Sequence, residues 1–220
     1  MKRIRTLIAI IAVSLTTASC AVTKYNSGIP AMEVTPIALL QPLSYIEFML
    51  KDHSMAISDS LSQISSSTLA EIVSNRIPVD CIIPVEYTEE MMAEVDVLPG
   101  LDPKTLFGAT IPDKTRQLIL DSGHRYGAIV FSRGFTREHG SYATDVAKGA
   151  IIGIATAILT MGALVGTIIP TKSISQVSIM IVDAETNRIV YYDRTPEQEY
   201  EPLNRRNLEG QVNSIVKGFK

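Results

Sequence analysis

Short apolar runs bounded by turn-forming residues recur along the chain and predict β-strands. Residues 34–43 contain the run Ile-Ala-Leu-Leu between Pro36 and Pro42, which predicts a strand. Residues 79–87 are nearly all apolar, which predicts a strand at the centre of a sheet with both faces covered. Residues 126–132 form a third apolar run, and we predict another buried strand there.

From residue 57 onward, apolar positions recur at the three- and four-residue spacing of an amphipathic helix. One face of this helix is apolar: Ile57, Leu61, Ile64, Thr68, Leu69, Ile72 and Val73. Serines dominate the other face, so we expect the serine-rich face to be solvated. A second, shorter helix is predicted to begin with Asp113 as its N-cap, after Pro112, and to end near Gly123.

The C-terminal part of the chain predicts a β-hairpin followed by a closing helix. Residues 175–182 and 188–192 have the apolar character of strands, and Asp183 and Asn187 between them tolerate turn geometry. The apolar positions of the last helix fall on one stripe: Leu208, Val212, Ile215, Val216 and Phe219. We therefore expect this helix to pack against the rest of the domain with one face.

The order of these elements predicts a mixed α/β fold. Strand, helix, strand, helix and strand follow one another, which favours right-handed crossovers and at least partly parallel pairing. An apolar insertion, a β-hairpin and a final helix come next. We therefore predict a single α/β domain over residues 34–220, with a partly parallel sheet, helices packed on it and an apolar insertion at 146–169.

The first twenty residues have the features of an export signal. Three basic residues precede a short apolar stretch, and the small residues Ala18 and Ser19 lead into Cys20. This ending resembles the lipobox of bacterial lipoproteins, in which the signal is cut before a cysteine that becomes acylated. We predict a signal peptide at 1–19, acylation of Cys20 and a tether over 20–33. The alternative is an ordinary cleaved signal in which the cysteine has no special role.

Acylation would place the protein on a membrane of the cell envelope. Each acyl methylene buried in the bilayer contributes about 0.8 kcal/mol, so several chains hold a protein stably. Ala21 follows Cys20, which resembles lipoproteins that are sorted to the outer membrane. We therefore expect the domain to face the periplasm from the outer membrane.

The composition is that of a folded and weakly acidic protein. Of the 220 residues, 46% are hydrophobic and 20% are charged, which excludes an intrinsically disordered chain. The formal charge is −3, and signal cleavage would remove three basic residues, so no nucleic-acid partner is expected. If Cys20 is acylated, Cys81 has no cysteine partner in the chain, and its apolar neighbours predict a small buried side chain.

Residues 150–169 form the most unusual segment, because its twenty residues carry no charge and could cross a bilayer as a helix. A single crossing would divide the predicted sheet between two compartments. Three arrangements therefore remain open: a buried helical hairpin, a segment that lies on or dips into lipid, and a segment that joins copies of the chain in a membrane assembly. The side chains that we expect to contact a partner or lipid are Ile151, Ile154, Leu159 and Leu164.

The residues that could carry catalysis or bind a metal form no known motif. His53, His124 and His139 are far apart, and no nucleophile elbow, phosphate loop or dinucleotide fingerprint occurs. We therefore expect no enzymatic activity, no cofactor and no metal site. Arg133 and Arg137 follow a predicted strand, where α/β folds place binding sites, and we expect them to contact a partner or lipid.

The order of elements and two short segments resemble a family of envelope proteins. Residues 128–132 (Ala-Ile-Val-Phe-Ser) precede the insertion, and residues 182–187 (Val-Asp-Ala-Glu-Thr-Asn) connect the strands of the predicted hairpin. This pattern resembles proteins that share the TolB amino-terminal fold, a group that includes CsgG and LpoB. Asn187 stands where that group has glycine, and asparagine also tolerates the left-handed conformation. The resemblance implies protein–protein interactions in the envelope and no catalytic residues.

These observations predict a non-catalytic, acylated envelope lipoprotein that binds partner proteins or copies of itself. The alternative is a subunit of an oligomeric membrane secretion or transport complex, whose apolar insertion enters the bilayer. A third hypothesis is a hydrolase that acts on envelope material through the loop that contains Ser141, although the sequence shows no catalytic triad or metal-ligand set to support it.

Overall fold

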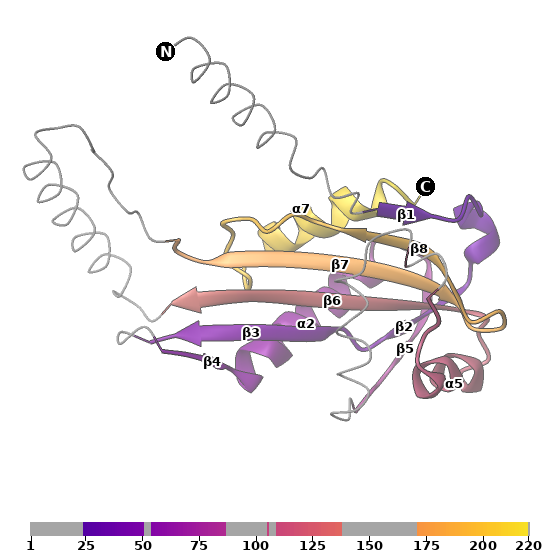
Figure 1. Cartoon of the computed structure of the whole chain (residues 1–220), viewed down its shortest axis with the longest axis horizontal. Coiled ribbons are helices and arrows are strands. Elements are labelled where there is room, and N and C mark those ends of the chain that lie inside the picture. Colours follow the sequence, from indigo (N-terminus) through magenta and orange to yellow (C-terminus); the bar gives the residue numbers. More distant parts are fainter. Residues whose placement is uncertain (1–23, 51–53, 87–104, 106–108, 138–170, 220) are drawn as a thin grey trace, which may run out of the picture.

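The structure, a computed structural model, describes residues 24–50, 54–86, 105, 109–137 and 171–219. These residues form an eight-stranded sheet with helices on both faces (Figure 1). The strands are β1 (Lys24–Asn26), β2 (Ile37–Leu40), β3 (Leu43–Met49), β4 (Met55–Ile57), β5 (Val79–Ile83), β6 (Tyr126–Arg137), β7 (Ile174–Asp183) and β8 (Arg188–Arg194). The helices are the 3-10 helix η1 (Ala31–Val34), α2 (Asp59–Ser74), α5 (Asp113–Asp121) and α7 (Arg205–Val216).

The sheet is mixed, and the predicted fold class is confirmed. Its strands follow the order β1-β8-β7-β6-β2-β5, while β6 also pairs with β3, and β3 with β4. β2 is parallel to β5 and β6, and β3 is parallel to β6, whereas the other pairs are antiparallel. The twelve residues of β6 accommodate two neighbours on one side, because β2 pairs from Tyr126 onward and β3 from Phe131 onward.

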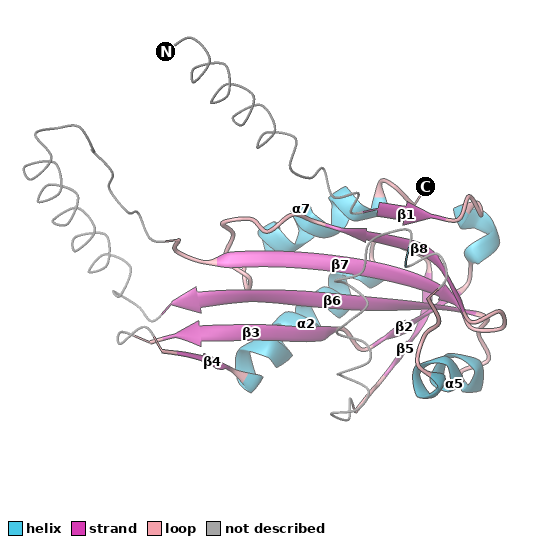
Figure 2. Cartoon of the chain, in the orientation of Figure 1, coloured by secondary structure: helices cyan, strands magenta, loops and turns pink. Residues whose placement is uncertain are grey.

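Helices α2 and α7 cover one face of the sheet (Figure 2). Alternate strand residues point toward these helices, since successive side chains of a strand lie on opposite faces. This core includes Ile37, Leu39, Leu69, Ile72, Ala128, Val130, Val177, Ile179 and Ile181. All five residues of the predicted stripe on the closing helix are buried, which confirms that helix.

Helix α5 packs on the other face, at one end of the sheet. Ile119 of α5 is fully buried and lies against Gly127 of β6, where an added Cβ would clash with the isoleucine side chain. The helix can approach the strand this closely because residue 127 is a glycine. The second core around this contact includes Leu40, Leu43, Ile111, Ile129, Phe131, Met180, Val182, Ile189 and Tyr192.

The β7–β8 hairpin forms where the sequence predicts it. Asn187 has a φ of 53°, in the left-handed region, and its side chain accepts a hydrogen bond from the backbone N–H of Ile111 at 3.0 Å. The buried carboxylate of Asp183 accepts hydrogen bonds from the backbone N–H groups of Glu185 at 3.0 Å and Thr186 at 3.3 Å. Both turn residues therefore act as expected.

The buried face of α2 differs from the predicted one. Ile64 is 53% exposed, whereas Ser65 and Ser66 are buried between the helix and the sheet. The hydroxyl of Ser66 donates a hydrogen bond to the carbonyl of Pro42 at 2.6 Å. Small side chains allow the helix to lie close to β3, so part of the serine-rich face is packed rather than solvated.

β5 lies at the end of the strand order, so the prediction of a central strand was wrong. Its side chains alternate between half-buried and exposed, and Ile82 is 45% exposed. A continuous apolar run does not distinguish a central strand from an edge strand, because which strands pair is decided by distant parts of the chain.

The limits of α5 also differ slightly from expectation. Asp113 is the first helical residue, the N-cap position is Pro112, and no side chain caps this end. The helix ends where predicted, since Gly123 has a φ of 81° directly after the last turn.

The segment expected to be a tether is partly folded. β1 pairs antiparallel with β8, with Lys24 opposite Asp193, and η1 follows it. Ile29 and Ala31 pack against the core under α2 and α7. A three-residue strand has too little sequence pattern to predict, so only its pairing with β8 shows that the fold includes residues 24–33.

Candidate interaction surface

Part of the α5 side of the sheet is not covered by any described helix. α5 lies at one end, and β3, β4 and the adjoining halves of β6 and β7 extend beyond it (Figure 1). We call this part the open face. It consists of the side chains that the register places on this side of the sheet: Tyr45, Glu47, Met49, Met55, Ile57, Arg133, Phe135, Arg137, Ile174 and Gln176.

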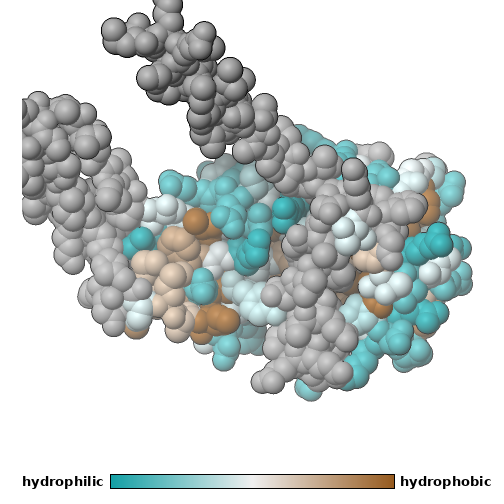
Figure 3. Space-filling view, in the orientation of Figure 1, coloured by the Kyte–Doolittle hydropathy of each residue, from teal (hydrophilic) through white to brown (hydrophobic). Residues whose placement is uncertain are grey.

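Strand register places apolar and charged side chains side by side on the open face. Tyr45 of β3 lies beside Arg133 of β6. Glu47 lies between Phe135 of β6 and Ile57 of β4. Paired residues of neighbouring strands share a face, so the two kinds of side chain interleave across three strands. Figure 3 shows hydrophobic and hydrophilic areas next to one another on this side of the molecule.

The open face includes apolar side chains that are strongly exposed. Ile57 is 58% exposed and Met55 is 42% exposed. Full burial of an aliphatic side chain contributes about 1.5–3 kcal/mol, so covering the exposed parts of these two side chains would contribute about 2 kcal/mol together. A binding partner can therefore gain free energy by covering this strand pair.

Arg133 is exposed but held in a defined position. Its Nε donates a hydrogen bond to Oε1 of Gln176 at 2.9 Å, and Nε2 of Gln176 donates to the carbonyl of Thr195 at 2.9 Å. Burial raises the pKa of nearby Tyr192, while the positive charges of Arg194 and Arg133 oppose that rise. A fixed guanidinium of this kind suits a carboxylate or phosphate group on a partner.

Arg137 connects the ends of β6 and β7. Its Nε donates a hydrogen bond to the carbonyl of Thr171 at 2.8 Å, and its guanidinium lies 5.8 Å from the ring centroid of Phe135. The described residues on either side of 138–170 therefore lie next to each other at this end of the sheet.

Two of the side chains predicted to contact a partner or lipid, Arg133 and Arg137, lie together on the open face. The other predicted positions lie outside the described residues: Cys20, Ile151, Ile154, Leu159 and Leu164, with the signal peptide at 1–19 and the insertion at 146–169. In the ranges that the structure describes, no helix combines the length and apolar character needed to span a membrane.

The apolar half of the open face was missed by the sequence analysis. It belongs to β3 and β4, which we did not predict as strands. The aromatic residues Tyr45 and Phe48 in the segment Leu-Ser-Tyr-Ile-Glu-Phe-Met are a strand signal that could have identified β3. No signal in the sequence shows that the described helices leave one face of β3 open.

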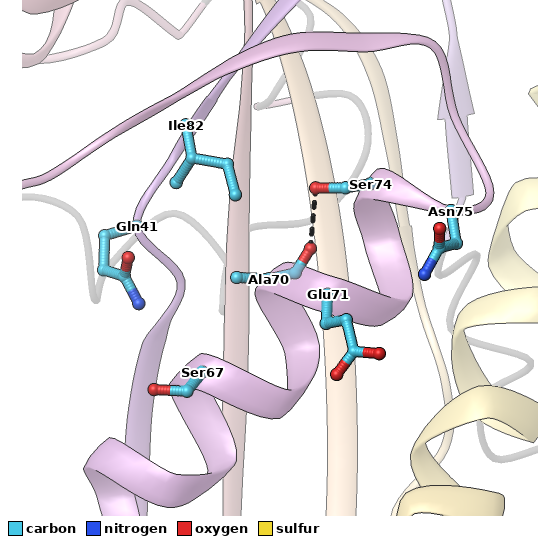
Figure 4. Close-up of a pocket in the computed structure, with 7 residues that line it drawn as sticks. All are labelled: Gln41, Ser67, Ala70, Glu71, Ser74, Asn75 and Ile82. Atoms are coloured by element: carbon cyan, nitrogen blue, oxygen red, sulfur yellow. Dashed lines mark hydrogen bonds between the residues drawn. The ribbon is translucent and has the colours of Figure 1, made fainter.

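A surface hollow of about 420 Å³ lies on the opposite face, between α2 and the strands β2 and β5 (Figure 4). It is lined by Gln41, Ser67, Ala70, Glu71, Ser74, Asn75 and Ile82. The hydroxyl of Ser74 donates to the carbonyl of Ala70 at 2.8 Å. Two hydrogen bonds of 2.7 Å from Arg205 hold the carboxylate of Glu71 and lower its pKa. Among these seven residues, none places a nucleophile beside a base.

A polar cluster at the end of α5 links this helix to β5. Nε2 of His124 lies 3.0 Å from a carboxylate oxygen of Asp80, and Nδ1 lies 2.9 Å from the carbonyl of Ser122. Cys81 is half-buried rather than fully buried as predicted, and its Sγ lies 3.9 Å from Nδ1. Nδ1 also lies 3.0 Å from Oγ of Ser122, so its nearest neighbours are oxygen atoms rather than the thiol. In the described part of the chain, no three acidic, histidine or cysteine side chains are placed to hold a metal ion.

No known protein family matches the chain by sequence, and no curated protein sequence does so either. Several solved structures are similar in fold. A PelC dodecamer from Paraburkholderia phytofirmans is 8% identical, with 89% of this chain and 94% of that chain covered and a TM-score of 0.45. The C-terminal domain of LpoB from Salmonella enterica is 9% identical, with 80% and 88% covered and a TM-score of 0.31.

The lipoprotein GNA1162 from Neisseria meningitidis is also similar. It is 11% identical, with 83% of this chain and 97% of that chain covered and a TM-score of 0.32. LpoB belongs to the group that the sequence resembles. At these identities the likeness is one of fold alone.

Proposed function

We propose that this protein is a non-catalytic, acylated lipoprotein of the bacterial envelope whose α/β domain binds partner proteins through the open face. The observation that carries this proposal is a sheet surface that no described helix covers, with exposed Met55 and Ile57 on β4 and the fixed guanidinium of Arg133 two strands away on β6. The open face also contains residue types that are enriched in protein interfaces, namely Tyr45, Phe135, Met49 and Met55.

The envelope location rests on the N-terminal sequence. The basic residues, the short apolar stretch and the small residues before Cys20 support export and acylation. A labelled palmitate analogue should enter the wild-type protein and not the Cys20→Ser variant. Equal labelling of the two proteins would show that the acyl group is attached elsewhere, and absence of label from both would exclude an acylated lipoprotein.

Site-specific crosslinking in cells tests the binding surface. A photoreactive phenylalanine analogue at position 45 lies on the open face, and the same analogue at the exposed Ser214 of α7 is the matched control. We expect protein adducts of defined mass from position 45 and none from position 214. Equal adducts at both positions, or none at position 45, would contradict a partner site on the open face.

The alternative function is a subunit of an oligomeric membrane complex, which the uncharged stretch at 150–169 favours. Light scattering of residues 21–220, with and without mild detergent, separates the two functions. The binding-module proposal expects a soluble monomer without detergent. Aggregates that become a defined oligomer only in detergent would favour the membrane complex.

A further inference from the structure

The distance between the proposed lipid anchor and the folded domain is short. β1 begins at Lys24, and its pairing with β8 extends to Asn26, opposite Tyr191. The backbone N–H of Ser27 then donates to the carbonyl of Val190 at 2.9 Å, which continues the attachment. An extended chain advances at most about 3.6 Å per residue, so Cys20 lies within about 14 Å of Lys24.

This reach is smaller than the domain itself. A domain of this size has a radius of gyration of about 16 Å, so a 14 Å connection cannot let it rotate freely beside the bilayer. We propose that the protein lies with the β1 edge of its sheet against phospholipid headgroups. This inference rests on the proposed acylation of Cys20 and adds the orientation of the domain.

The chemistry of the β1 edge fits an anionic headgroup surface. Lys24 is exposed, and its Nζ lies 5.9 Å from the ring centroid of Tyr191 and next to Gly218, just beyond the end of α7. Lys217 beside it is exposed as well, whereas Asp193, which pairs with Lys24 in the sheet, is half-buried. Two exposed lysines therefore border the point at which the chain leads to the anchor, with the charge of Lys24 partly balanced by Asp193, and each lysine near an anionic membrane contributes about 1 kcal/mol.

The same orientation places the open face away from the lipid. From β1 the strands continue through β8, β7, β6 and β3 to β4. Five steps of about 4.8 Å separate β1 from β4 by about 24 Å (Figure 1). The exposed side chains of β4 are then on the edge far from the bilayer, where a periplasmic protein can reach them.

Fluorescence quenching by labelled lipids tests the orientation. The full-length acylated protein is placed in vesicles of phosphatidylethanolamine and phosphatidylglycerol with quenchers on the headgroups. One variant carries a fluorophore at Asn26→Cys, an exposed position of β1, and the other at Ala56→Cys, both in a Cys81→Ser background. We expect the label at 26 to lose most of its fluorescence and the label at 56 to lose little. Equal quenching, or stronger quenching at 56, would overturn the orientation.

Two controls separate this inference from the proposed function. Mass spectrometry of the same samples shows whether Cys20 is acylated, and a protein without the acyl mass would overturn both proposals. An acylated protein without a difference between the labels would overturn the orientation alone. A Gly/Ser insertion of about twenty residues after Val22 allows a span of about 25 Å, and we expect it to abolish most of the difference.

Discussion

Replacing the buried carboxylate of Asp183 tests most clearly whether its hydrogen bonds stabilise the turn between β7 and β8. The residue is 2% exposed, and it accepts hydrogen bonds from Arg125 at 3.2 and 2.7 Å and from the N–H groups of Glu185 and Thr186. In the Asp183→Asn variant one amide oxygen can still accept from the turn. The amide NH₂ group, however, faces the guanidinium, and two donors cannot pair.

The expected loss of stability follows from these contacts. Hydrogen bonds to a charged group contribute about 1.5–3 kcal/mol, and a buried group left without its partner adds a desolvation cost. The side chain of Arg125 is 46% exposed, so water can replace part of the lost contact and reduce the desolvation cost. We therefore expect a total loss of about 2–3 kcal/mol in the free energy of unfolding. For a chain of this length that corresponds to a melting temperature lower by about 4–12 °C.

The assay is urea unfolding and thermal melting of the mature protein, with Glu185→Gln as the matched control. Glu185 lies 3.3 Å from the Nε of Arg125, but its side chain is 60% exposed, so its removal should cause no measurable change. A variant Asp183→Asn as stable as the wild type would refute the reasoning. An equal loss in the control would show that surface charge, rather than the buried carboxylate, stabilises the turn.

The pH dependence provides an independent check of the same contact. Burial raises the pKa of Asp183, but the hydrogen bonds from Arg125 and Thr186 outweigh it, and the pKa falls below its ordinary value of 3.8. The folded protein therefore favours the ionised form, whose contribution is complete above the unfolded value and is lost as the pH falls through the lowered value. The stability difference between wild type and Asp183→Asn should be constant near neutral pH and narrow below pH 3.8. A difference that persists unchanged in acid would contradict the charged hydrogen bonds.

Three further changes test other contacts, each by urea unfolding. Asn187→Gly keeps the left-handed turn and loses one side-chain hydrogen bond, so we expect a loss of about 1 kcal/mol, whereas Asn187→Val should lose about 1–2 kcal/mol more. An order reversed between these two variants would refute the turn argument. Tyr191→Phe removes the 2.6 Å bond to the carbonyl of Ile215 and should cost about 1 kcal/mol; an unchanged midpoint would show that this bond does not stabilise α7. Glu71→Gln breaks an exposed ion pair with Arg205 and should leave the midpoint unchanged, and a clear loss would show that the pair stabilises α2 against α7.

The hairpin and the closing helix could be predicted because their signals are local. Asn187 tolerates a positive φ, Asp183 bonds to the next backbone N–H groups, and the stripe on α7 has the helical period. Each of these properties depends on residues within a few positions of one another. The order of elements also predicted at least partly parallel pairing, because crossover connections are restricted, and β2, β5 and β6 pair in parallel.

The sheet position of β5 and the packed serines of α2 depend on partners far away in the chain. Nothing near Ile82 shows that β5 has a neighbour on one side only among the described strands, and the burial of Ser66 depends on the carbonyl of Pro42. The candidate site likewise combines residues with a local sequence signal and residues that only distant contacts bring together. Arg133 could be selected because it follows a buried run, whereas Tyr45 joined it through a strand register that spans more than eighty positions.

By itself, the sequence determined which segments are apolar and where the turns lie, and it predicted an export signal at the N-terminus, because these properties depend on residue type and local spacing. The tertiary structure alone decided which strands are neighbours, which face of β3 and β4 the described helices leave open and how close Lys24 lies to the core. The physical reason is that pairing and burial are set by contacts between residues distant in the chain, and a side chain is exposed only when no other element packs over it.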